Sequence, residues 1–161
     1  MIEMRNIRTE DRVEIALPAP VIFLGFLLLG FVISLFFPTR LSVPRSLLLT
    51  LGFVSIVAAS VIGSLAIREM RKAGTSPDPS KPPSKLITEG PFSFTRNPIY
   101  LSFALGYVGL TLVFSLSWAL PLLIVALILV DRRVVAFEER YLEGKFGIDY
   151  ARYKSKTHRW L

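Results

Sequence analysis

The sequence contains no cysteine and a single histidine, His158. Without cysteine the chain forms no disulfide and offers no thiolate, and one imidazole does not make a histidine cluster. We therefore expect no metal site. Charge is also absent from three long runs, which cover residues 15–39, 46–67 and 97–130. Such runs favour a protein whose apolar segments lie in a lipid bilayer.

The lengths of these runs predict how often the chain crosses the membrane. Apolar residues make up 52% of the sequence, and its mean hydropathy is +0.54. Each of the first two runs is long enough for one crossing. The third would be roughly 51 Å long as a helix, which is too long for one crossing and suits two short ones. We predict an all-α integral membrane helical bundle with about four transmembrane helices, and the last one continues as an extended cytoplasmic C-terminal helix. These spans are expected at about 17–37, 45–67, 98–114 and 118–135.

The chain of 161 residues suits one membrane domain, 1–161, in three parts. Residues 1–67 hold the N-terminal tail and the first two spans. Residues 68–97 form a cytoplasmic loop, rich in proline and serine over 73–85, and residues 98–161 form a helical hairpin with a C-terminal segment. Residues 1–14 mix acidic and basic side chains, so we do not expect a cleaved signal peptide there.

Basic residues predict the orientation. Of the 19 Lys and Arg residues, all but Arg40 and Arg45 fall in the tail, in the loop after the second span or in the C-terminal segment. The positive-inside rule makes these segments cytoplasmic, so both termini are expected in the cytoplasm of a multi-pass protein. The net charge of +7 is then explained by topology and by contact with anionic membrane lipids. No folded basic domain is evident, so no nucleic-acid partner is expected.

Arg96 and Asn97 lie where the third span begins. A helix N-terminus attracts anions, and an arginine beside it can clamp a carboxylate or phosphate. Two simpler interpretations remain open: Arg96 anchors the span to lipid headgroups, and Asn97 caps the helix. Pro98 suits the first helical position, where a missing N–H costs nothing.

Glu138 and Glu139 follow the fourth span. Neighbouring helical residues point about 100° apart, so these two carboxylates are not expected to form one dyad. One can face the bundle while the other faces solvent or a basic neighbour such as Arg132 or Arg133. Both lie on the same membrane side as Arg96, which raises their interest above that of an ordinary surface pair.

Small residues and aromatic residues punctuate the helices. Ala59 with Gly63, and Ser60 with Ser64, would let neighbouring helices approach closely. Gly147 predicts where the last helix ends. Four aromatic residues of the C-terminal segment form either an interfacial belt or a wall for a flat heterocycle or a cation: Phe146, Tyr150, Tyr153 and Trp160.

Two motifs flank the predicted hairpin. The first motif, residues 86–101, reads LITEGPFSFTRNPIYL, and the second motif, residues 138–160, reads EERYLEGKFGIDYARYKSKTHRW. Together they resemble the isoprenylcysteine carboxyl methyltransferase and phospholipid methyltransferase superfamily. The resemblance covers roughly residues 74–160 and places the two motifs in the expected order around a helical hairpin.

This resemblance implies a membrane-embedded enzyme that uses S-adenosylmethionine, bound at the cytoplasmic face between the two motifs. It implies catalytic roles for Arg96, Glu138, Glu139 and Arg159. It also implies a cofactor pocket formed by Leu86, Thr88, Gly90, Arg96, Asn97, Pro98, Tyr100, Glu138, Glu139, Tyr150 and Tyr153.

The methyl acceptor is expected to be lipophilic and to arrive from the bilayer. A prenylcysteine-like carboxylate would be positioned by Arg159 or Arg96, whereas a phospholipid amine would give a proton to Glu138 or Glu139. Asn97 stands where the prenylcysteine enzymes usually have histidine, so the resemblance leaves the acceptor open. The alternative is a non-catalytic multi-pass scaffold or assembly protein. A transporter fits less well, because no predicted span has an ionisable residue at its middle.

Overall fold

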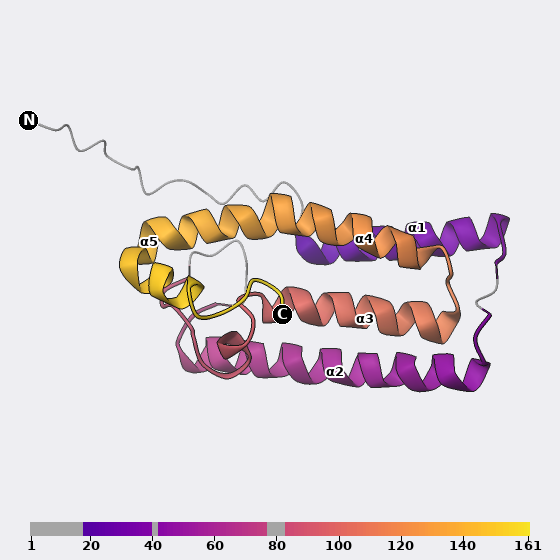
Figure 1. Ribbon diagram of the computed structural model, residues 1–161, viewed down its shortest axis with the longest axis horizontal. Coiled ribbons are helices and arrows are strands. Elements are labelled where there is room, and N and C mark those ends of the chain that lie inside the picture. The colour runs from indigo at the N-terminus through magenta and orange to yellow at the C-terminus, as the bar shows by residue number, and fades with distance from the viewer. Residues whose placement is uncertain (1–17, 40–41, 77–82) are drawn as a thin grey trace, which may run out of the picture.

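The computed structural model describes residues 18–39, 42–76 and 83–161 as a helical bundle (Figure 1). The helices are α1 (Ala19–Phe36), α2 (Arg45–Lys72), a short 3-10 helix η1 (Gly90–Ser93), α3 (Pro98–Phe114), α4 (Ala119–Leu129), a π-helical segment η2 (Val130–Val135) and α5 (Ala136–Lys154). The described residues form no strand and a single isolated β-bridge, between Thr95 and His158. The predicted all-α fold is confirmed. The expectation for residues 1–14 falls outside the described part of the chain.

Two helices are long and apolar enough to cross a membrane, α1 with 18 residues and α2 with 28. In the most hydropathic window of α2 only 11% of residues are buried, whereas the core helix of a water-soluble protein is mostly buried. Large apolar side chains such as Phe36 and Val57 are 75% and 61% exposed. Such an apolar surface is suited to lipid. Helix α3 has 17 residues and α4 has 11, so a count of four crossings remains a prediction.

Helices α2 and α3 pack closely through small residues. A Cβ atom at Gly109 would lie 2.5 Å from Ile56 Cγ1 and 2.9 Å from the carbonyl oxygen of Gly52, so only glycine fits there. A Cβ atom at Gly63 would lie 3.0 Å from the hydroxyl of Ser102. The pattern at Ala59 and Gly63 thus marks the contact between these helices, as predicted. The second pair, Ser60 and Ser64, is exposed.

Helix α1 packs against α4 and α3. The Phe23 ring contacts Phe103 and Tyr107, with ring centroids 6.2 and 6.4 Å apart. The buried Tyr107 hydroxyl donates a hydrogen bond of 2.9 Å to the carbonyl of Ala119, where α4 begins. This hydrogen bond joins α3 to the start of α4 and fixes the direction of α4.

The hairpin places both motifs at one end of the bundle (Figure 1). The α3–α4 turn and the connection after α1 lie at the other end, where the Trp118 indole donates to the carbonyl of Phe37 at 2.8 Å. We call the first end the polar cap, made of residues 73–76, 83–97 and 136–161. The described residues of the predicted loop 73–85 are not helical, and 77–82 lie outside the described part.

Helix α5 extends past the predicted stop. Gly147 adopts φ 51° and ψ −120°, a conformation that suits glycine alone, and the chain then resumes a helix to Lys154. The prediction of a break at Gly147 is confirmed, but the break is a kink and not an end. This kink turns the chain back, so that Tyr150 and Tyr153 become buried in the polar cap.

The π-helical segment η2 was not predicted. A helical residue turns the chain by about 100°, so positions eight apart, such as Asp131 and Glu139, would point about 80° apart on a regular α-helix. A π turn contains one more residue than an α turn, but both rotate the chain by one full turn. The extra residue therefore brings the two carboxylates to within about 20° of one face.

Candidate functional site

The two motifs meet through backbone and side-chain hydrogen bonds. The Arg96 N–H donates to the carbonyl of His158 at 2.9 Å. The Asn97 amide donates to the carbonyl of Arg159 at 2.8 Å, and the Thr95 hydroxyl donates to the same oxygen at 3.1 Å. Asn97 precedes α3 but makes no side-chain cap, so its amide fastens the second motif instead of closing the helix.

Four charged side chains form one continuous network behind this junction. Arg159 donates to both oxygens of Glu139, at 3.2 and 2.6 Å, and to the carboxylate of Asp131 at 3.1 Å. Arg96 donates to Glu139 at 2.9 Å and to the carbonyls of Lys154 and Thr157 at 3.0 and 3.1 Å. The Glu139 side chain is only 6% exposed, so its charge is held by two arginines away from bulk water.

Glu138 has a different environment from its neighbour. Its carboxylate accepts one hydrogen bond, of 2.9 Å, from the Tyr100 hydroxyl. Burial raises the pKa of Glu138 and the charge of Glu139 raises it further, while the bond from Tyr100 opposes the rise. The two carboxylates do not form one dyad, as expected from their spacing. The suggested basic partners, Arg132 and Arg133, are exposed, and Glu139 binds Arg96 and Arg159 instead.

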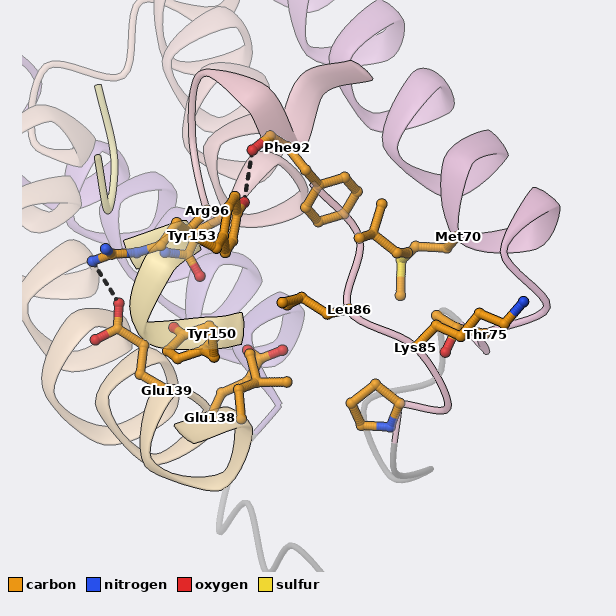
Figure 2. A pocket seen from close by; sticks show the side chains of 14 residues that line it. Met70, Thr75, Lys85, Leu86, Phe92, Arg96, Glu138, Glu139, Tyr150 and Tyr153 are labelled. Atoms are coloured by element: carbon orange, nitrogen blue, oxygen red, sulfur yellow. Dashed lines mark hydrogen bonds and ion pairs between the residues drawn. The ribbon is translucent and has the colours of Figure 1, made fainter. Parts of the chain in front are cut away.

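A pocket opens between the two motifs (Figure 2). It has about 550 Å³ of empty volume, including the part open to solvent. Its lining comes from the end of α2, the loop before η1, the start of α3 and both halves of α5: Met70, Thr75, Pro83, Lys85, Leu86, Ile87, Phe92, Arg96, Asn97, Glu138, Glu139, Leu142, Tyr150 and Tyr153.

Two tyrosines form the aromatic part of this wall. Tyr150 and Tyr153 meet edge to face with their centroids 6.1 Å apart. The Tyr153 hydroxyl donates to the carbonyl of Phe92 at 2.6 Å, and burial raises its pKa to about 12. Burial also raises the pKa of Tyr150. The other aromatic candidates lie elsewhere: Phe146 is contacted by the Lys145 ammonium, and the Trp160 indole donates to Asp131 at 2.8 Å.

The residues expected in the cofactor pocket are arranged in two groups. Seven of them line the pocket: Leu86, Arg96, Asn97, Glu138, Glu139, Tyr150 and Tyr153. Thr88 lines a wider neighbouring hollow of about 780 Å³ of empty volume, which shares Leu86 and Tyr153 with the pocket. These assignments remain predictions, because no ligand is present.

The other three residues expected in the cofactor pocket, and Arg159, which was expected to be catalytic, lie outside the lining. Pro98 is buried at the first turn of α3. Gly90 has φ +59°, and a Cβ atom there would lie 2.9 Å from Glu69, so it lets the loop pass close to α2. Tyr100 reaches the pocket through Glu138, and Arg159 reaches it through Glu139.

Some contributors were not predicted. Met70 comes from the part of α2 that extends beyond the expected span, and Lys85 comes from the proline-rich loop. Neither belongs to a pattern that would single it out. Asp131 was noted only as the residue that ends the uncharged run. Its position, about two helical turns before the double glutamate, was the available signal.

Comparisons with known proteins agree with the motifs. The family model of phospholipid methyltransferase matches residues 47–149, which include most of α2, the hairpin and the pocket lining except Tyr150 and Tyr153. An uncharacterized protein of Haemophilus influenzae is 41% identical over 63 residues, which are 39% of this chain and all of that protein. No solved structure matches. The family match covers more than half of the chain and fits the superfamily suggested by the two motifs, so the chain belongs to the phospholipid methyltransferase family.

Proposed function

We propose that this protein is a membrane methyltransferase that binds S-adenosylmethionine in the pocket between the two motifs and methylates a lipophilic acceptor. The observation that carries the proposal is the convergence of Arg96, Glu138 and the Tyr150–Tyr153 pair on one pocket at a single end of an apolar bundle. Family membership and this pocket together disfavour a non-catalytic scaffold.

Arg96 supports a ligand with an anionic end. Its side chain lines the pocket, and a carboxylate satisfies a guanidinium well. The carboxylate of S-adenosylmethionine is a group of the right kind.

The remaining lining fits the rest of this cofactor by chemistry. Tyr150, Tyr153 and Phe92 offer aromatic surface to an adenine ring or a sulfonium, and Glu138 offers a carboxylate to an amino group or a ribose hydroxyl. When bound, S-adenosylmethionine would supply an electrophilic methyl group. The protein's own contribution is then mainly to hold the donor and the acceptor in line.

Contacts in the site favour an amine acceptor over a carboxylate. Arg159, one of the two arginines expected to position a prenylcysteine-like carboxylate, already binds both Asp131 and Glu139. Among the described residues, Glu138 accepts its hydrogen bond from the neutral Tyr100 hydroxyl, so its carboxylate can take a proton from an ammonium group. An acceptor with the chemistry of a phospholipid amine therefore suits the site better.

We place the polar cap at the cytoplasmic face, because the described basic residues lie mainly there and the positive-inside rule favours that side. The acceptor would then approach from the bilayer, beside α2 and α3.

Binding of S-adenosylmethionine to the detergent-purified protein, measured by calorimetry, tests the proposal. The parent should release binding heat, and Glu138→Gln should weaken binding. Glu143→Gln is the matched control, because Glu143 lies on the same helix, pairs with Lys154 and does not line the pocket. A folded parent without binding heat would contradict the proposal.

The acceptor class is tested with membranes and a radiolabelled methyl donor. Label that stays non-volatile after mild alkali, in lipid or in a released head group, indicates an N-methyl product, whereas label released as volatile methanol indicates a methyl ester. Our proposal expects the first result, and alkali-labile label would overturn the choice of an amine.

A further inference from the structure

Asp131 lies at the far end of the charged network, away from the pocket lining. It accepts hydrogen bonds from Arg159 at 3.1 and 3.3 Å and from the Trp160 indole at 2.8 Å. We infer that Asp131 is a positioning residue, which sets the pocket's Arg96 through Arg159 and Glu139. This inference rests on the proposed function.

The path from Asp131 to the pocket consists of direct contacts. Asp131 holds one nitrogen of the Arg159 guanidinium, and the other two nitrogens donate to Glu139. Glu139 in turn accepts from Arg96, which lines the pocket. A guanidinium has a rigid fork, so fixing one edge of Arg159 also fixes the edge that faces Glu139.

The same anchor also holds the backbone of the second motif. Arg159 and Trp160 are adjacent, and Asp131 binds both side chains. The carbonyl of Arg159 accepts the hydrogen bonds from Thr95 and Asn97, beside Arg96. Asp131 thus restrains Arg96 in two ways, through side chains and through the joined backbones of the two motifs.

The π-helical segment explains how Asp131 comes to lie near Glu139. Without the extra residue in η2, Asp131 and Glu139 would point about 80° apart, which suits a shared arginine less well than the angle of about 20°. Single π turns occur frequently at functional sites. The inference explains why this chain has one before the double glutamate.

Charge adds a second effect. The network holds two carboxylates and two guanidiniums, so its formal charge is zero. Asp131→Asn would leave it with an excess of one positive charge. S-adenosylmethionine carries a sulfonium and an ammonium against one carboxylate, so it is a net cation. An additional positive charge near its site should weaken binding, with a low-dielectric surrounding making the effect larger.

Calorimetry with S-adenosylmethionine on purified parent, Asp131→Asn and Asp131→Glu tests the inference. Asparagine keeps the shape of aspartate without its charge, whereas glutamate keeps the charge with a different shape. We expect Asp131→Asn to lose about five- to tenfold in affinity and Asp131→Glu to stay closer to the parent. A residue that only fills space would give the opposite order. Glu143→Gln serves as the control and should bind like the parent.

A double-mutant cycle shows whether the effect travels along the network. Arg159→Lys keeps the charge but loses the fork, so it should weaken binding by itself. Adding Asp131→Asn to it should then cost much less than in the parent, because the connection is already broken. Fully additive losses would overturn the proposed route. If Asp131→Asn does not fold, parent-like affinity of Arg159→Lys overturns the inference.

The outcomes separate the two proposals. A folded parent that does not bind the cofactor contradicts the proposed function, and the positioning role fails with it. A parent that binds, together with an Asp131→Asn variant of equal affinity, contradicts the positioning role alone.

Discussion

Helices α2 and α3 pack closely because glycines and other small residues lie between them. The segments of the polar cap are instead held together by long charged side chains. At Gly109 the two helix backbones approach so closely that a methyl group would collide with Ile56. In the cap, Arg96, Glu139 and Arg159 bridge elements that are far apart in the sequence. In lipid, close packing is the main available attraction between helices. Outside it, directed charge pairs define one geometry, at a cost in desolvation.

The substitution Glu139→Gln should cause the largest loss of stability. It leaves two arginines without their shared carboxylate, and removal of one partner from a buried pair costs about 3–5 kcal/mol. We expect a loss near the lower end, because the Arg159 side chain is 35% exposed. Unfolding of the detergent-solubilised protein measures the effect. Glu143→Gln breaks a pair that is about half exposed and should cost less than about 1 kcal/mol. Equal losses would mean that the Glu139 network is no stronger than a surface pair.

The substitution Gly109→Ala tests the packing of α2 against α3. Overpacking of a well-packed contact costs about 1–3 kcal/mol, and the new Cβ atom would meet the Gly52 backbone as well as Ile56. Gly25→Ala is the control in α1, because nothing lies within 4 Å of its Cβ position. The loss should not change with salt concentration, because no charge takes part in this contact. A Gly109→Ala variant as stable as the parent would show that α2 and α3 can separate without cost.

The apolar body could be predicted well from the sequence. Runs without charge, the proline at position 98 and the Ala59–Gly63 pattern are local signals, and each one predicts its own element. Gly147 also predicted a break, but the residues after it resume a helix because Tyr150 and Tyr153 become buried against the first motif. That gain depends on a segment some 60 residues earlier, so it is invisible in a local pattern.

The polar cap could be predicted only in part. The motifs identified Arg96, Glu138 and Glu139, but not which partner each would have. Partner choice depends on the π turn, which changes the direction of every side chain after it and leaves no mark in hydropathy. Asp131 was missed for that reason: on a regular helix it would not share a face with Glu139.

The pH dependence of stability should separate Glu138 from Glu139. Burial, with the charge of Glu139, raises the pKa of Glu138 from its ordinary value of 4.5. A carboxyl group with a raised pKa stabilises the fold below its ordinary pKa, and this contribution is lost as the pH rises through the raised value. The parent should therefore lose stability relative to Glu138→Gln as the pH rises from about 4 toward neutrality. Unfolding of both proteins over this pH range measures the difference in stability. Parallel curves of stability against pH would contradict the raised pKa of Glu138.

The smallest changes in stability should come from alanine substitutions at two glycines of α5 that differ only in their backbone conformation. Nothing lies within 4 Å of a Cβ atom at Gly144 or at Gly147, so space does not distinguish them. Gly144 is helical, and alanine there should stabilise the protein by about 0.5–1 kcal/mol. Gly147 has φ 51°, so alanine there should destabilise it by about 1 kcal/mol.

Cofactor binding adds a second readout to this pair. The kink at Gly147 returns Tyr150 and Tyr153 to the pocket, so Gly147→Ala should also weaken binding of S-adenosylmethionine, whereas Gly144→Ala should leave it unchanged. If both variants bind like the parent, the kink serves the fold and not the pocket. If only Gly147→Ala binds less well, the geometry of the aromatic wall depends on one backbone conformation, in contrast to Gly109, where the same substitution fails for lack of space.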